Sequence, residues 1–94
     1  ITISDEPLEG TNDTILVKLV FPELQKSFIR RFMLKDTVNE IINTSKVLCK
    51  CDEKVNAYIA NSYSKLEINK TFIDYNLSGR VLITLRLEIG VYKS

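Results

Sequence analysis

The chain has 94 residues, of which 45% are hydrophobic and 27% are charged. A chain of this length forms one small domain, which buries about two thirds of the surface that its unfolded form exposes. Thirteen basic residues are balanced by twelve acidic ones, so no excess charge of one sign is available to neutralise nucleic-acid phosphates or an anionic membrane. No run approaches the roughly eighteen consecutive apolar residues of a membrane helix. We therefore expect neither nucleic-acid binding nor membrane insertion.

Residues 1–13, ITISDEPLEGTND, are rich in acidic, Gly, Pro and Asn residues and lack a sustained hydrophobic period. This composition is typical of a linker, so we expect a flexible N-terminal arm. The chain opens on Ile1 rather than methionine and ends in a short polar segment. We expect it to come from a longer protein, with the folded domain at residues 14–89 and a C-terminal tail at 90–94.

Two segments after the arm alternate in hydrophobicity, which is typical of strands. In residues 14–21, one face carries only large apolar side chains: Ile15, Val17, Leu19 and Phe21. Pro22 interrupts the run, and residues 26–34 resume the alternation, with one face made of Phe28, Arg30, Phe32 and Leu34. We expect the two strands to form a hairpin. Arg30 breaks an apolar face, which indicates a bulge, a guanidinium that reaches out from the core margin, or a basic partner-binding residue.

A helix is predicted to begin at Asp36, whose carboxylate can accept hydrogen bonds from the amides of the first turn. Glu40 complements the helix dipole at this end. Apolar residues then recur at helical spacing: Val38, Ile41, Ile42, Val47 and Leu48. We expect Thr44, Ser45 and residues 49–54, CKCDEK, to form the fraying end of the helix and its exit loop.

The remaining residues predict strands separated by polar turns. Residues 55–59 alternate through Val55, Ala57 and Ile59, and a turn around Asn61 and Ser62 precedes a short strand at Leu66 and Ile68. Residues 69–79 are polar and turn-rich, with buried contacts expected from Phe72, Tyr75 and Leu77. Residues 80–89, RVLITLRLEI, alternate again and predict a long strand.

One helix of about three turns covers only one face of a sheet, and the first and last strands are the most apolar, which places them in the middle. The sequence therefore predicts an α+β fold of the β-grasp type. In this fold a mixed sheet of four to five strands wraps around one helix, in ββαββ order with a short extra strand.

Residues 65–87 carry a family resemblance, because KLEINKTFIDYNL followed by LRL resembles the second half of ubiquitin. The positions identical in that comparison are Leu66, Glu67, Thr71, Asp74, Tyr75, Asn76, Leu85, Arg86 and Leu87. The resemblance implies a ubiquitin-like β-grasp fold in which Tyr75 braces a loop through its hydroxyl. It also implies a set of core residues: Leu66, Phe72, Leu77, Leu85 and Leu87.

The positions that carry function in ubiquitin differ in this chain. The segment after Leu87 contains one glycine rather than a terminal Gly-Gly pair, so we do not expect conjugation to other proteins. Two positions of the aliphatic patch that ubiquitin receptors recognise fall on Ala60 and Thr84, which predicts a small and partly polar patch. Ser64 stands at the position of a chain-forming lysine.

The first half of the chain is similar to UBX domains, which are ubiquitin-like adaptors of the AAA ATPase valosin-containing protein. Lys18 matches a basic residue of the first strand, and Arg30-Arg31-Phe32 matches a motif of the second. Tyr63-Ser64-Lys65 stands where UBX domains have Phe-Pro-Arg. Serine replaces a rigid, often cis, proline in that turn, so Ser64 needs another means of being held.

Catalysis is not expected, because the sequence has no histidine, no Gly-rich phosphate loop and no nucleophile in an activating context. Cys49 and Cys51 are too close in sequence for an unstrained mutual disulfide and supply only half of a zinc site. We expect free thiols, a reducing intracellular setting, cytoplasmic or nuclear, and neither a metal nor a cofactor.

The sequence thus predicts a monomeric, non-catalytic protein-protein interaction module that acts as an adaptor in the ubiquitin/proteasome pathway. One alternative is a UBX-type adaptor of the ATPase. Another is a Ras-association or FERM-type domain that binds a small GTPase along its second strand, through Lys26 and Arg31, or docks within its parent protein through Val20 and Leu82. The predicted partner-binding residues are Lys18, Arg30, Tyr63, Ser64 and Lys65.

Overall fold

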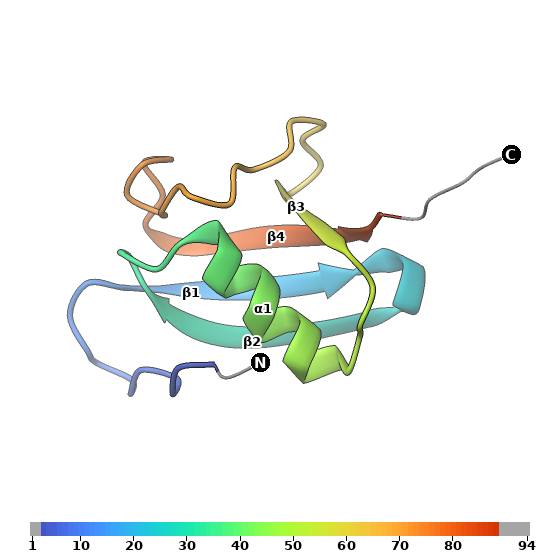
Figure 1. The fold of residues 1–94 in the computed structure, drawn as a ribbon. Helices are drawn as coiled ribbons and strands as arrows, with labels where there is room; N and C mark the ends of the chain where they lie inside the picture. Colours follow the sequence, from blue (N-terminus) through green and yellow to red (C-terminus); the bar gives the residue numbers. More distant parts are fainter. Residues whose placement is uncertain (1–2, 89–94) are drawn as a thin grey trace, which may run out of the picture.

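A computed structural model describes residues 3–88 of the chain as a four-stranded sheet with one helix across one face (Figure 1). The elements in chain order are β1 (Thr14–Phe21), the 3-10 turn η1 (Pro22–Leu24), β2 (Lys26–Met33), α1 (Val38–Cys49), β3 (Val55–Ile59) and β4 (Gly79–Leu87). The strands lie in the order β2-β1-β4-β3. Because β1 and β4 are parallel and the other two pairs are antiparallel, the sheet is mixed, as predicted.

The two central strands supply the apolar floor of the core, which confirms their predicted position. All four inward side chains of β1 are fully buried, and Ile83 and Leu85 of β4 join them. The pairing of β1 with β2 is continuous from Thr14 opposite Met33 to Phe21 opposite Lys26. The alternation around Arg30 is therefore unbroken, and β2 has no bulge.

The helix differs from the prediction at both ends. Its N-cap is Thr37, whose hydroxyl accepts from the Glu40 amide, whereas the Asp36 carboxylate accepts from the Met33 amide. Thr44 and Ser45 were expected to fray, but both are buried inside the helix, while Val47 and Leu48 are exposed. Residues 3, 4, 7 and 11 positions after Val38 lie on the same side of the helix, and all of them are buried: Ile41, Ile42, Ser45 and Cys49. This helical stripe faces the sheet, so position rather than hydrophobicity decides burial here.

The connection between β3 and β4 packs as part of the domain, although it forms no strand. The short strand predicted at Leu66 and Ile68 was wrong: one backbone hydrogen bond of 2.8 Å joins the Leu66 amide to the Ala57 carbonyl. Leu66 and Phe72 are buried, as predicted. The Tyr75 hydroxyl accepts from the Glu67 amide at 2.7 Å, which confirms the loop-bracing role implied by the ubiquitin resemblance.

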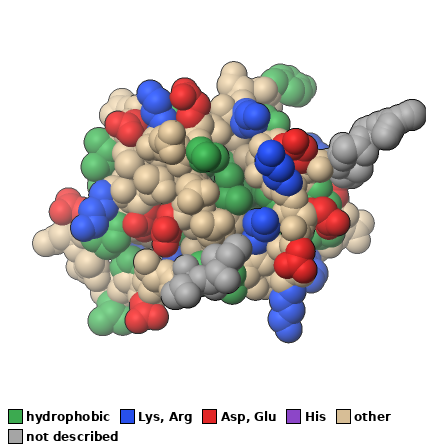
Figure 2. Space-filling view, in the orientation of Figure 1, with side chains coloured by type: hydrophobic (Ala, Val, Ile, Leu, Met, Phe, Trp, Pro, Cys, Tyr) green, Lys and Arg blue, Asp and Glu red, His purple; other side chains and the backbone are tan. Residues whose placement is uncertain are grey.

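The face of the molecule that carries α1 has basic and acidic side chains interspersed over its surface (Figure 2). This mixture agrees with the near-neutral net charge of +1. Within residues 3–88, no helix is both long and apolar enough to cross a membrane. Residue 89 of the predicted last strand and the predicted tail at 90–94 lie outside the described residues.

Candidate functional site

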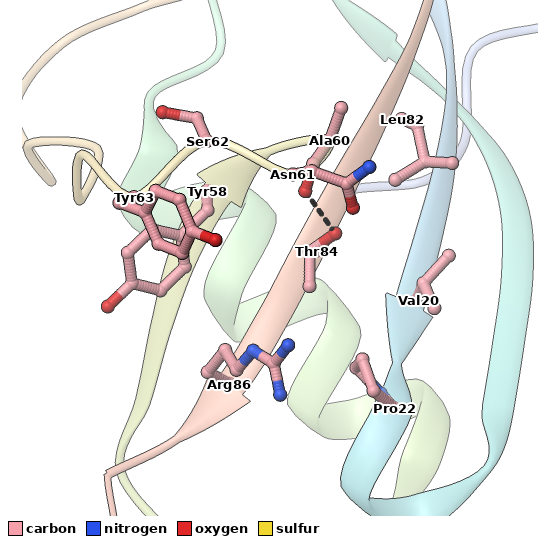
Figure 3. Close-up of a pocket in the computed structure, with 10 residues that line it drawn as sticks. All are labelled: Val20, Pro22, Tyr58, Ala60, Asn61, Ser62, Tyr63, Leu82, Thr84 and Arg86. Carbon is pink, nitrogen blue, oxygen red and sulfur yellow. Dashed lines mark hydrogen bonds between the residues drawn. The ribbon is translucent and has the colours of Figure 1, made fainter.

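The outer face of the sheet, opposite α1, carries a broad concavity. Its volume is about 700 Å³ (Figure 3). Strand alternation aims every second side chain of the central strands at this face. The concavity is lined by ten residues: Val20, Pro22, Tyr58, Ala60, Asn61, Ser62, Tyr63, Leu82, Thr84 and Arg86. We call this surface the outer groove.

A hydrogen bond from a side chain of β4 to the backbone of the turn after β3 lies at the floor of the outer groove. The Thr84 hydroxyl donates to the Ala60 carbonyl at 2.7 Å (Figure 3). Thr84 is only 8% exposed as a result. These two residues stand at the ubiquitin patch positions, so the small and partly polar centre predicted from the sequence is present in the structure. The apolar contribution comes instead from Val20, Leu82 and Tyr58 around it.

Tyr63 forms the rim of the outer groove and is 99% exposed. The turn that carries it is ordered by hydrogen bonds: the Ser62 amide donates to the Ile59 carbonyl at 2.8 Å, and the Ser64 amide donates to the Ser62 hydroxyl at 3.0 Å. No cis peptide occurs within residues 3–88. The Ser62 hydroxyl thus helps to order this turn. Ser64 and Lys65 are exposed beside Tyr63.

Lys18 lies on the same outer face but borders a second, smaller concavity of about 340 Å³. It stands between Ile29 of β2 and Leu82 of β4 in the pairing of the strands. Ile29 is 67% exposed, and Leu82 borders both concavities. The outer face therefore presents exposed apolar side chains on both sides of a basic residue.

Arg30 does not belong to this surface. It lies on the helix side of the sheet, is 7% exposed, and places its guanidinium 4.9 Å from the centre of the Phe32 ring. Its Nη2 donates to the Ser4 carbonyl of the N-terminal arm at 2.6 Å. Of the five predicted site residues, Tyr63 and Lys18 border the two concavities of the outer face. Ser64 and Lys65 are exposed directly after Tyr63, and Arg30 is buried on the helix side.

Five residues of the outer groove were not among the functional positions predicted from the sequence: Pro22, Tyr58, Asn61, Ser62 and Arg86. Arg86 is held over the groove by an ion pair of 3.3 Å with Glu23. The parity of β3 could have identified Tyr58, since it is the bulky residue out of phase with Val55, Ala57 and Ile59. The approach of η1 to β4 is a tertiary feature, so nothing in the sequence pattern pointed to Pro22 or to the Arg86–Glu23 pair.

The described residues contain no group of three or more side chains suited to holding a metal ion. Cys49 and Cys51 are buried free thiols. Burial raises the pKa of the Cys49 thiol above its usual value, and the nearby Cys51 raises it further. A raised pKa keeps the thiol protonated near neutral pH, which opposes nucleophilic reactivity.

No known family profile matches the sequence, and no curated protein matches it. Solved structures do match. A UBX domain determined in solution has a TM-score of 0.79 and 14% identity, over 100% of this chain and 87% of that one. The ubiquitin-like domain of an Arabidopsis thaliana protein has a TM-score of 0.69 and 17% identity, over 96% and 97%. The chain has the ubiquitin-like β-grasp fold.

The ubiquitin-like fold alone does not decide what this chain does. A chain of a toluene 4-monooxygenase complex also matches, with a TM-score of 0.68 and 12% identity over 80% of this chain and 99% of that one. One fold hosts many functions. Any function of this ubiquitin-like domain must therefore be argued from its own surface.

Proposed function

We propose that this chain is a non-catalytic, ubiquitin-like protein-binding module that contacts its partner through the outer face of the sheet. The observation that carries the proposal is the outer groove with the fully exposed Tyr63 at its rim. Exposed aromatic side chains beside an apolar concavity are typical anchors of protein interfaces, because their burial contributes a large share of the binding energy.

The form of the outer groove favours an adaptor in the ubiquitin/proteasome pathway over a domain that ubiquitin receptors bind in place of ubiquitin. The hydrogen-bonded Thr84 and Ala60 replace the aliphatic centre of the ubiquitin patch. A partner must therefore engage the residues around this centre, above all Leu82 and Tyr63. Two buried free thiols support a reducing, intracellular setting for such an adaptor.

A second candidate function is that of a UBX-type adaptor of the ATPase valosin-containing protein. Its support is the position of Tyr63, Ser64 and Lys65 on an ordered turn, which leaves an aromatic and a basic side chain free to enter a partner. The high TM-score to a UBX domain agrees with this hypothesis. The Ser62 hydroxyl then takes the part of the rigid proline.

The small-GTPase alternative has weaker support. A GTPase that pairs with the edge of β2 needs the outward amides of that strand, and the Arg31 amide already donates to the Glu6 carboxylate at 2.8 Å. The N-terminal arm would have to leave before such pairing, so we rank this partner third.

A binding experiment with matched variants tests the proposal. The 94-residue chain, Tyr63→Ala and Ile73→Ala would each be titrated against purified valosin-containing protein. Ile73 is an exposed aliphatic residue that does not line the outer groove, so it serves as the control. We expect Tyr63→Ala to weaken binding at least about tenfold, the effect of losing an interface anchor, and Ile73→Ala to leave it unchanged.

Absence of ATPase binding by the native chain would remove the UBX hypothesis but not the general proposal. Affinity purification with the same three chains and with Leu82→Asp as baits, followed by mass spectrometry, would then identify proteins that are lost with Tyr63→Ala and retained with Ile73→Ala. If every captured protein were retained by both variants and by Leu82→Asp, the outer face would not be a binding surface.

A further inference from the structure

The N-terminal arm lies along the free edge of β2, where the strand meets the start of α1 (Figure 1). Four hydrogen bonds describe its path. The Arg30 guanidinium donates to the Ser4 carbonyl at 2.6 Å, and the Ser4 hydroxyl donates to the Glu40 carboxylate at 3.2 Å. The Arg31 amide donates to the Glu6 carboxylate at 2.8 Å, and the Arg31 guanidinium donates to the Pro7 carbonyl at 3.4 Å. The arm therefore runs in the same direction as β2.

The charges of the arm and of the strand are complementary. Residues 3–13 contain four acidic side chains and no basic one: Asp5, Glu6, Glu9 and Asp13. Residues 26–33 contain three basic side chains and no acidic one: Lys26, Arg30 and Arg31. An acidic extended segment thus lies on a basic strand edge, although the chain as a whole is nearly neutral.

The hydrogen bonds of the β2 edge show how such a segment is recognised. As an edge strand, β2 directs every second amide away from the sheet. Two of these outward amides are capped by carboxylates: the Met33 amide by Asp36 at 2.9 Å, and the Arg31 amide by Glu6 at 2.8 Å. The Asp36 cap comes from the adjoining turn. The Glu6 cap comes from the arm and leaves with it.

The arm is attached to the edge but not built into the domain. Within residues 3–88, no arm residue belongs to the hydrophobic core or packs against it as a partly buried side chain. A few hydrogen bonds at partly exposed positions attach the arm to the edge. Each of them contributes about 0.5–1.5 kcal/mol to the stability of this contact. Arg30, in contrast, stays stacked on Phe32, which positions its guanidinium independently of the arm.

We propose that the β2 edge is a binding site for extended acidic peptide segments, and that residues 3–7 are its built-in occupant, which a partner's segment replaces. Recognition uses a carbonyl oxygen on the Arg30 guanidinium and a carboxylate on the Arg31 amide. This site lies at the β2 edge, and no residue of β2 lines the outer groove, so the proposal does not depend on the function proposed for that groove.

Hydrogen exchange of the 94-residue chain tests the contact itself. Glu6→Lys removes the carboxylate that caps the Arg31 amide and brings a cation next to Arg31. Glu9→Lys makes the same charge change in an exposed arm residue that forms no hydrogen bond with any residue from 3 to 88. We expect the Arg31 amide to exchange faster in Glu6→Lys and at the native rate in Glu9→Lys. The Met33 amide, which Asp36 caps, should exchange equally in all three.

A peptide supplied in trans tests the binding site. The probe is the arm's own segment, residues 3–9 (ISDEPLE), titrated against the native chain and both variants while the Arg30 and Arg31 amide resonances are followed by NMR. If the tethered arm occupies the edge about 90% of the time, it weakens the apparent affinity of a competitor about tenfold. We therefore expect Glu6→Lys to bind the peptide about tenfold more tightly than the native chain or Glu9→Lys does.

The proposal is overturned by equal peptide affinity of the three chains, by absence of peptide binding to all of them, or by unchanged Arg31 exchange in Glu6→Lys. A probe peptide that itself carries Glu6→Lys should bind none of the chains, and equal binding of this peptide would show that the carboxylate is not recognised.

Discussion

Phe72 offers a quantitative test of the connection between β3 and β4. The residue lies outside every helix and strand, yet it is 2% exposed, and the centre of its ring is 6.0 Å from that of Phe32. Replacement of a buried phenylalanine by alanine costs about 3–5 kcal/mol, because the transfer energy of the ring is lost and a cavity remains. A domain of this size has a total unfolding free energy of about 5–14 kcal/mol. Phe72→Ala should therefore remove about a fifth of the stability or more.

Urea denaturation followed by far-ultraviolet circular dichroism measures this loss. With a slope of about 1.5 kcal/mol per molar urea, the midpoint of Phe72→Ala should fall by about 2–3 M. The control is Ile73→Ala at the next position, which is 61% exposed and should change the unfolding free energy by no more than about 0.5 kcal/mol. Similar midpoints for the two variants would mean that the connection is not part of the core.

Two further predictions concern the helix. Thr37→Ala removes the acceptor of the Glu40 amide and should lower the unfolding free energy by about 1 kcal/mol in the same urea assay; an unchanged value would mean that Thr37 is not an effective N-cap. For Cys49, burial and Cys51 raise the pKa of the thiol, so its contribution to stability is complete below the ordinary thiol pKa and is lost as the pH rises beyond it. The unfolding free energy of the native chain should fall more steeply between about pH 8 and about pH 10 than that of Cys49→Ala; parallel slopes would contradict the raised pKa.

Most of the fold prediction came from the alternation of apolar and polar residues along the strands. The alternation of β1 and β4 predicted which side chains are buried and that these strands lie in the centre, since strands buried on one face and flanked on both edges need the most apolar sequence. The same argument was wrong at Leu66 and Ile68. Only Leu66 bonds to the edge strand β3, through its amide and the Ala57 carbonyl, whereas the Ile68 carbonyl accepts from the Asn39 amide in the first turn of α1.

The candidate site was predicted only in part. Tyr63 borders the outer groove and Lys18 lies on the outer face of β1, while Ser64 and Lys65 are exposed on the turn that follows Tyr63. Arg30 was selected for its charge, but its parity puts it on the helix side of β2, where Phe32 and Ser4 enclose it. A lone arginine on an apolar face was therefore a sign of burial at the core margin, one of the alternatives that the sequence had left open.

Local residue order was sufficient to specify the strands, the helix and the core side chains, because burial on one face of a regular element imposes a period that the sequence must carry. Contacts between segments that are distant in the chain impose no such period on the sequence. The groove formed where η1 approaches β4, the turn held by Ser62, and the arm laid along β2 each depend on where separate segments meet in space. These contacts between distant segments create the surfaces proposed for function, and the segments come together only in the folded chain.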